Sequence, residues 1–289
     1  MATKYYIDEP RIDELADMLS KTKRIIPVIE DNDPQYRAVY MLAEKKGCGV
    51  VALSIVANAL VSYQLTSRGE TYWSMFAEWM MKTESSTPYY LLETHTRFLR
   101  DTPYNRLGLS RKIERLKKIY NSTLASELYD NPLKYCERID ELTNRISNIL
   151  GTDPFAKTIV FAGKMYYYVC RACGASVGGE IPVPVDRRVA YVSLSSCLIK
   201  GCSSELIECS RDLMKPRYRN LVINAWIEVS KKSGIPSYNL DSIIWVLGRY
   251  IRSSRGVEGV LQHILAAYPG LSRHIDDLRR IVMEFMKCR

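Results

Sequence analysis

The helical spacing of its apolar residues constrains the fold of this chain more than any other feature. In almost every segment, apolar side chains recur roughly every three to four positions, not at every second position as in a half-buried strand. Residues 8–21, for example, open with acids and Pro10, which is typical of a helix start, and repeat Ile12, Leu15 and Leu19 on one face. The pattern therefore predicts an all-α protein.

The expected helices follow one another along the whole chain. The stretch 48–63 is apolar nearly all round and contains a Val-Val-Ala-Leu-Ser-Ile-Val run that also suits a strand, but no partner strand is evident, so we expect a buried helix. No internal repeat or long linker is present, and we expect residues 1–289 to form one globular module in two lobes with a cleft between them. The remaining helices are expected at residues 34–47, 70–83, 88–100, 110–120, 131–150, 154–174, 186–198, 203–213, 216–232, 239–251, 256–268 and 271–287.

The net charge favours an anionic partner. Lys and Arg total 41 against 32 Asp and Glu, a formal charge of +9, and nucleic acid is the commonest partner of such proteins. The chain has two basic groups; such groups are usually solvated faces, although the second could equally contact a DNA backbone. The first lies on or beside one helical stretch and comprises Arg106, Arg111, Lys112, Arg115, Lys117 and Lys118. The second follows Trp245 and comprises Arg249, Arg252 and Arg255.

Hydropathy predicts no contact with a membrane. The chain has no run of about 18 uncharged apolar residues, the length that a membrane-spanning helix needs. Acidic residues also occur near its start, where a secretory signal would need an apolar stretch. We therefore expect an intracellular, cytoplasmic protein.

The eight cysteines do not follow a metal-binding pattern. Cys170 and Cys173 form a Cys-x-x-Cys pair inside a helical stretch, and no second pair of this kind exists. The spacing of the other cysteines does not reproduce the four closely spaced ligands of an iron–sulfur cluster. We expect buried thiols or one or two disulfides, and neither a metal nor another cofactor.

One stretch, residues 149–161, contains a candidate for a reactive lysine. A helix ends at Leu150-Gly151, a short hairpin follows, and a second helix begins near Pro154, which predicts a helix–hairpin–helix over about 131–174. The hairpin and the new helix N-terminus are expected to direct backbone N–H groups outward onto a phosphate. Lys157 falls in the first turn of the second helix, where the positive helix end favours the neutral amine of a nucleophile. From spacing alone, Lys157 could equally pair with a phosphate or with solvent.

A candidate carboxylate follows in Asp186. It comes directly after the extended Ile-Pro-Val-Pro-Val segment, residues 181–185, and heads the next expected helix. An aspartate in that position commonly caps the helix. Capping holds a carboxylate rigidly, so it is compatible with a catalytic role.

Together these residues resemble the helix–hairpin–helix superfamily of base-excision DNA glycosylases, and most closely its archaeal 8-oxoguanine DNA glycosylase (AGOG) branch. The hairpin departs from most of the superfamily because it reads Leu-Gly-Thr-Asp-Pro-Phe-Ala-Lys and lacks Pro-Gly-x-Gly. The segment between lysine and aspartate is also longer than is usual in the superfamily. The similar stretches are Asp33-Pro34-Gln35-Tyr36, Thr71-Tyr72-Trp73, residues 156–165, Pro184-Val185-Asp186 and residues 241–245.

The resemblance implies a bifunctional DNA N-glycosylase and lyase that flips 8-oxoguanine out of DNA and excises it. Lys157 would attack C1′ of the damaged nucleoside and form a Schiff base that permits β-elimination. Asp186 would stabilise the positive charge that develops on the sugar. The partner implied is damaged DNA containing 8-oxoguanine, and we expect the protein to act as a monomer on the nucleoid.

The resemblance also implies a pocket for the flipped base, in which Phe161 and Trp245 stack on the base. Helical spacing alone would more often put these two rings in the core. Lys164 could be a solvated lysine, and Asp241 could cap a helix. The residues implied to contact the base are Gln35, Trp73, Phe161, Lys164, Asp241 and Trp245.

Two other functions remain open from the sequence. One is a helix–hairpin–helix glycosylase for a different lesion, such as an oxidised pyrimidine or an alkylated purine. The other is a non-catalytic helical protein that binds DNA through the same hairpin.

Overall fold

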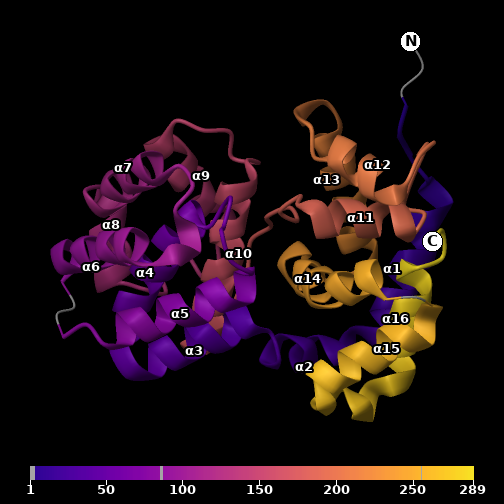
Figure 1. Cartoon of the computed structure of the whole chain (residues 1–289), viewed down its shortest axis with the longest axis horizontal. Helices are drawn as coiled ribbons and strands as arrows, with labels where there is room; N and C mark the ends of the chain where they lie inside the picture. The colour runs from indigo at the N-terminus through magenta and orange to yellow at the C-terminus, as the bar shows by residue number, and fades with distance from the viewer. Residues whose placement is uncertain (1–3, 85–86, 255) are drawn as a thin grey trace. The chain divides into compact units, whose positions relative to one another are not determined.

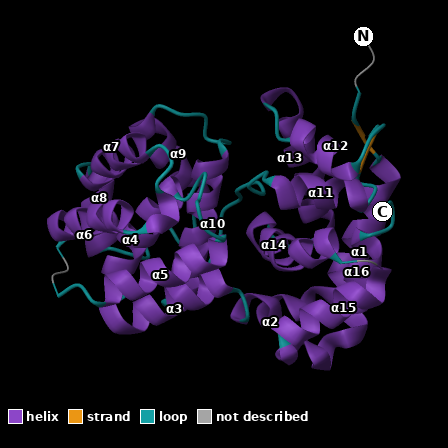
Figure 2. Ribbon diagram, viewed as in Figure 1, coloured by secondary structure: helices purple, strands orange, loops and turns teal. Residues whose placement is uncertain are grey.

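The computed structural model describes residues 4–84, 87–254 and 256–289, and within these ranges the chain is built of helices joined by loops, with almost no strand (Figure 2). The all-α prediction is confirmed. Its one exception is a short antiparallel ladder in which β1 (Tyr6–Ile7) pairs with β2 (Ile199–Lys200). Two residues per strand are too few to display a period, so apolar spacing could not predict the ladder. Arg255 lies outside the described residues.

The chain divides into two compact units. The central unit is Pro34–Ile181, and the terminal unit combines Met1–Asp33 with Pro182–Arg289. The chain thus leaves the terminal unit after α2 and returns to it before α11 (Figure 1).

The central unit is built around one buried helix, α4 (Cys48–Val61), whose residues from Val50 to Val61 are all buried. The segment 48–63 that resembled a strand is therefore a helix, as predicted. Helices α3, α7, α8 and α10 pack against it, although they come from separate parts of the sequence. The other helices of the unit are α3 (Pro34–Lys46), α5 (Gly69–Met81), α6 (Pro88–Asp101), α7 (Leu109–Tyr120), α8 (Thr123–Asp130), α9 (Ile139–Leu150) and α10 (Lys157–Ala172), with a 3₁₀ turn η2 (Pro103–Asn105).

The helix expected at 131–150 begins later, at Ile139, because residues 131–137 form turns instead. A short helix, α8, precedes these turns and was not expected. Gly163 explains how closely α9 and α10 approach: a Cβ at this position would lie 2.6 Å from Cγ2 of Thr143 on α9. Only glycine allows that approach without displacing the neighbouring side chain.

The terminal unit has its own apolar core. Helix α1 packs on α13, and α11 packs on α12 and α14. Trp226 is fully buried there, and its indole N–H donates a hydrogen bond to Oγ of Ser193 at 2.8 Å. The helices of the unit are α1 (Glu9–Thr22), α2 (Ile26–Asp31), α11 (Arg187–Ser195), α12 (Leu206–Leu213), α13 (Pro216–Ser233), α14 (Ser237–Ser253), α15 (Gly256–Ala267) and α16 (Ile275–Phe285), with 3₁₀ turns η1 (Lys23–Ile25) and η3 (Pro269–His274).

The cysteines form more disulfides than the sequence suggested. Within the described residues all eight are paired, and the expectation of thiols or one or two disulfides was wrong. The two members of the Cys-x-x-Cys pair bond to different partners, so they are not joint ligands of a metal. Spacing alone could not find the pairing, because eight cysteines allow about 105 pairings. The four disulfides are Cys48–Cys173 and Cys136–Cys170 in the central unit, and Cys197–Cys288 and Cys202–Cys209 in the terminal unit.

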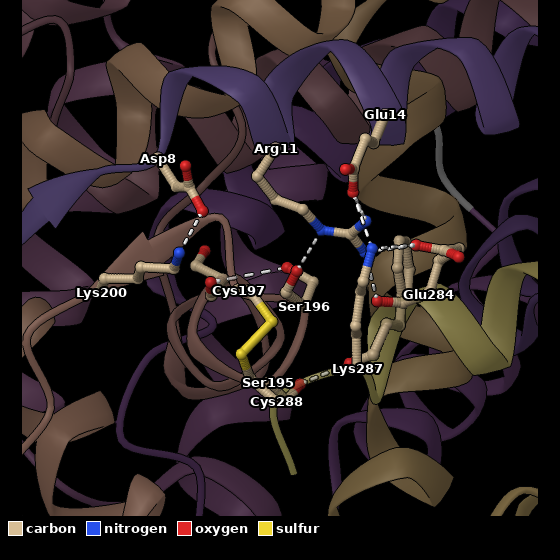
Figure 3. The surroundings of a disulfide bond; sticks show 12 residues. Asp8, Arg11, Glu14, Ser195, Ser196, Cys197, Lys200, Glu284, Lys287 and Cys288 are labelled. Atoms are coloured by element: carbon tan, nitrogen blue, oxygen red, sulfur yellow. Dashed lines mark hydrogen bonds and ion pairs between the residues drawn. A yellow bond between two sulfur atoms is a disulfide. The ribbon is translucent and has the colours of Figure 1, made fainter.

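The Cys197–Cys288 disulfide fixes the C-terminal segment beside a buried arginine (Figure 3). Nε of Arg11, a residue 3% exposed, donates to the Ser196 carbonyl at 2.6 Å, and its Nη2 donates to the Glu284 carbonyl at 2.9 Å. The N–H of Cys288 donates to the carbonyl of Ser195 at 2.8 Å. The segment after α16 is therefore held to the end of α11 by a covalent bond and a hydrogen bond, and Arg11 of α1 holds α16 itself.

No helix in the described part of the chain is both long and apolar enough to cross a membrane. In the same residues, no group of three or more His, Cys, Asp or Glu side chains has the arrangement of a metal site.

Candidate functional site

The hairpin between α9 and α10 forms where the sequence predicted it. Helix α9 ends at Leu150, and the capping residue Gly151 adopts the left-handed conformation (φ 61°) common at helix C-termini. The chain turns through residues 152–156, and α10 begins at Lys157. The helix–hairpin–helix is therefore confirmed, with its first helix shorter than expected.

Several backbone N–H groups of the hairpin form hydrogen bonds within the turn itself, which we did not expect. The N–H of Thr152 donates to the Ser147 carbonyl at 3.1 Å, and that of Ala156 donates to the Asp153 carbonyl at 2.9 Å. The side chain of Asp153 accepts from the N–H of Phe155 at 2.8 Å. These groups were expected to point outward to a phosphate, but they close the turn instead. Phe155 itself is 49% exposed at the hairpin.

Lys157 is an exposed side chain on the first residue of α10. The turn that carries Lys157 is held by hydrogen bonds from Arg115 of α7. Nη1 of Arg115 donates to Oγ1 of Thr158 at 3.1 Å and to the carbonyl of Leu60 at 3.0 Å. Arg115 thus ties the start of α10 to the end of α4, a contact between distant segments that the sequence did not reveal.

Phe161 and Lys164 follow along α10, one and two turns after Lys157. Phe161 is half-buried, and its ring meets the buried Trp73 ring edge-to-face at 6.1 Å between centroids. Lys164 is only 1% exposed, so the solvated alternative for this lysine was wrong. Its Nζ lies 3.9 Å from the centroid of the Tyr168 ring, a cation–π contact.

Gln35 completes the central-unit set. It lies in the first turn of α3, where its side chain is 3% exposed. Because α3 packs against both α5 and α10, the structure brings together the helices that carry Gln35, Trp73 and Phe161. These three helices therefore carry the buried amide of Gln35, the indole of Trp73 and the two lysines of α10.

In the terminal unit, Asp186 is the N-cap of α11. Its Oδ1 accepts from the backbone N–H of Arg188 at 2.7 Å and of Val189 at 3.0 Å. The capping role that the sequence suggested is confirmed. Three fixed points, the backbone and two hydrogen bonds, hold the half-buried carboxylate in one orientation.

Asp241 and Trp245 lie one turn apart on α14. Asp241 is 3% exposed, whereas Trp245 is half-buried. The alternative that Asp241 caps a helix was wrong, because α14 begins at Ser237 and Asp241 is inside it.

Arg188 links Asp186's helix to Trp245. Its guanidinium lies 4.2 Å from the centroid of the Trp245 ring, and its Nη1 donates to the Trp245 carbonyl at 2.7 Å. Arg252 is a further cation in this region. Its pKa is lowered, first by burial and then by the positive charges of Arg187 and Arg188. The sequence did not identify Arg188, because no spacing rule connects residues on separate helices.

One member of the first basic group is not on the surface. Lys112 is fully buried in α7, where its Nζ donates to Oδ1 of Asn105 and lies 4.6 Å from the centroid of the Tyr63 ring. Burial lowers the pKa of Lys112 to about 8. The basic stretch is therefore part surface and part core.

Comparison with known proteins agrees with this arrangement. A family profile described as AGOG, N-glycosylase/DNA lyase, matches residues 16–280, a range that includes the hairpin, Lys157 and Asp186. An N-glycosylase/DNA lyase of Aeropyrum pernix is 33% identical over 254 residues, 82% of each chain. One from Pyrobaculum aerophilum is 28% identical over 249 residues, 83% of this chain and 86% of its own.

A solved structure has the same fold. It is 8-oxoguanosine-complexed Pa-AGOG, an 8-oxoguanine DNA glycosylase from Pyrobaculum aerophilum, with a TM-score of 0.68 and 25% identity. The alignment covers 90% of this chain and 96% of that one. The extent of these matches places the chain in the AGOG family of N-glycosylase/DNA lyases.

Proposed function

We propose that this chain excises 8-oxoguanine from DNA and then cuts the strand at the abasic site, with Lys157 as the nucleophile and Asp186 as the carboxylate partner. The observation that carries the proposal is the position of Lys157. It is an exposed amine on the first residue of α10, directly after the hairpin, within a family match that spans residues 16–280. The similarity to a glycosylase structure that contains 8-oxoguanosine supports the choice of base.

The chemistry requires a neutral amine that attacks carbon. Nζ of Lys157 forms a bond to C1′ of the damaged nucleoside while the bond from C1′ to N9 breaks, and the electron pair leaves with the base. A proton then passes from the lysine nitrogen to O4′ as the C1′–O4′ bond breaks, and this ring opening leaves a protonated imine between Lys157 and C1′. Loss of a proton from C2′ then expels the 3′ phosphate, which cuts the strand by β-elimination.

Asp186 would stabilise the positive charge of the sugar in this reaction. A carboxylate that two backbone N–H groups already orient needs little reorganisation as charge develops, which is the condition for efficient electrostatic stabilisation. Lys157 belongs to the central unit and Asp186 to the terminal unit, so the proposal requires both units for activity and treats residues 1–289 as one functional module.

The base would stack on Phe161 and Trp245 and be recognised at its polar edges by Gln35, Trp73, Lys164 and Asp241. Flipping a base out of a duplex costs a few kcal/mol, and stacking on an aromatic ring returns roughly 1–3 kcal/mol. The amide oxygen of Gln35 can accept a hydrogen bond from N7–H of 8-oxoguanine, a proton that guanine lacks. We also propose that the protein acts on nucleoid DNA in the cytoplasm, as a monomer.

The substrate is tested with three duplexes that differ only in one base: 8-oxoguanine, guanine or an oxidised pyrimidine. Single-turnover assays with excess enzyme should release 8-oxoguanine and cut its strand, and leave the other two intact. The Gln35→Ala variant should narrow the preference over guanine, because the acceptor for N7–H is lost. Preferred release of the oxidised pyrimidine would reject 8-oxoguanine as the substrate, and unchanged discrimination in Gln35→Ala would reject the role of Gln35.

A further inference from the structure

A hollow beside the hairpin has the chemistry of a phosphate site. It has a volume of about 280 Å³ and lies on the central unit, where α7 meets the end of α9. Three of its lining side chains are cationic and one is acidic. The lining residues are Tyr63, Arg111, Glu114, Arg115, Lys118 and Leu150.

Two of these cations form no ion pair, although Glu114 lines the same hollow. Arg111 and Lys118 are exposed, and neither forms an ion pair with any residue that the structure describes. They project from α7 seven positions apart, so both lie on the same face of the helix. With three cations against Glu114, the hollow therefore presents an excess of positive charge to solvent.

Arg115 adds a third cation that is partly desolvated. Burial lowers its pKa, while the nearby Tyr63 ring, 5.8 Å from its guanidinium carbon, opposes that effect. A partly desolvated cation gains from a nearby anion, because the attraction is stronger where water is excluded.

The hairpin itself offers few backbone donors to a phosphate. Its N–H groups at Thr152, Phe155 and Ala156 donate within the turn and are not available to a phosphate. The hairpin also lacks the Pro-Gly-x-Gly sequence of most helix–hairpin–helix glycosylases.

We infer that the hollow formed by Arg111, Arg115 and Lys118 binds a backbone phosphate of the DNA substrate, in place of part of the grip that hairpin N–H groups would supply. This inference rests on the proposed function, because it assumes that DNA is the substrate. Arg115 connects the hollow to the chemistry: the same guanidinium that lines it holds Thr158, the residue after Lys157. A phosphate bound there would be anchored on the framework that positions the nucleophile.

The test compares two double variants of equal charge. Arg111→Gln with Lys118→Gln removes two cations from the hollow, whereas Arg106→Gln with Lys117→Gln removes two exposed cations on or beside the same helix that do not line it. Arg115 is left unchanged because it also supports the start of α10. Each protein is titrated by fluorescence anisotropy with a duplex that contains a tetrahydrofuran abasic analogue, at several salt concentrations.

The hollow variant should bind the duplex about 10- to 100-fold more weakly near 0.1 M salt, and the magnitude of its salt-dependence slope should fall by about one, the value for one phosphate contact. The other pair should stay within about threefold of the unmodified protein. Equal losses in the two pairs, or no loss in the hollow pair, would overturn the inference.

Binding of free 8-oxoguanosine separates this inference from the proposed function. The nucleoside has no phosphate, so the hollow variant should bind it as the unmodified protein does, measured by tryptophan fluorescence. If the unmodified protein binds neither the nucleoside nor the duplex, the proposed function fails. If it binds both and the hollow variant keeps its duplex affinity, only the inference about the hollow fails.

Discussion

At the scale of a single residue, the capping role of Asp186 can be separated from its proposed catalytic role. Its Oδ1 caps α11, which depends on an acceptor oxygen, whereas stabilisation of a cationic sugar depends on a negative charge. An asparagine keeps the oxygen and loses the charge. An alanine loses both.

We therefore expect Asp186→Asn to unfold at nearly the same temperature as the unmodified protein and Asp186→Ala to lose about 1 kcal/mol of stability with the cap. Both should slow single-turnover base release by about 100-fold or more, because both lack the charge. Thermal unfolding and release assays on the same preparations measure the two effects. Full activity in Asp186→Asn would mean that the residue is only a cap.

Lys112 is the second residue whose environment makes a prediction, this time about pH. Its pKa is near 8 in the folded protein, below the value of about 10.4 for an unfolded lysine. Between these values the unfolded chain binds more protons than the folded chain, so the contribution of Lys112 to the free energy of unfolding rises with pH. It is lost as pH falls from about 10 to 8.

Chemical unfolding at pH 8, 9 and 10 checks this expectation by comparing the unmodified protein with Lys112→Met. Other groups titrate in the same range, so the difference between the two proteins isolates the lysine. As pH rises, the free energy of unfolding of the unmodified protein should increase relative to that of Lys112→Met. A difference that is constant with pH would show that Lys112 keeps an ordinary pKa.

At the scale of elements, α10 carries the proposed chemistry at one end and disulfides at the other. Lys157 begins the helix, and Cys170 and Cys173 at its far end bond to Cys136 and Cys48. Both bonds hold α10 to other parts of the central unit. The helix is therefore fixed covalently at the end opposite the nucleophile.

The disulfides should contribute unequally to stability. Cys48 and Cys173 are 125 positions apart, whereas Cys202 and Cys209 are 7 apart. A longer closed loop removes more entropy from the unfolded chain, so replacing the first pair with alanine should cost about 2 kcal/mol more than replacing the second. Thermal unfolding of the two double variants makes the comparison. An equal loss, or a greater loss for the short loop, would contradict the chain-entropy explanation.

At the scale of the whole molecule, the sequence predicted most of the architecture, because the apolar residues of a helix recur at a spacing that can be recognised within the helix alone. Even the uniformly apolar α4 was predicted correctly. What it could not predict depends on contacts between distant segments: the β1–β2 ladder, the disulfide pairing, and the arginines that hold Thr158 and Trp245. The turns at 131–137 were missed because their apolar spacing resembles that of a helix.

The same distinction applies to the candidate site. The positions of Lys157 at a helix start and Asp186 at an N-cap follow from local signals, and the structure has both. The burial of Lys164 and Asp241 does not, because each depends on helices from elsewhere in the chain. The catalytic roles of these residues stay predictions.

The central claim is that Lys157 forms the covalent intermediate, and borohydride trapping tests it most directly. Borohydride reduces the imine between the lysine and C1′ to a stable amine, which links protein to DNA. With an 8-oxoguanine duplex, the unmodified protein and the exposed-lysine control Lys117→Gln should form the adduct and Lys157→Gln should not. Peptide mass spectrometry should locate the linkage on Lys157. An adduct that persists in Lys157→Gln, or one located on Lys164, would contradict the account.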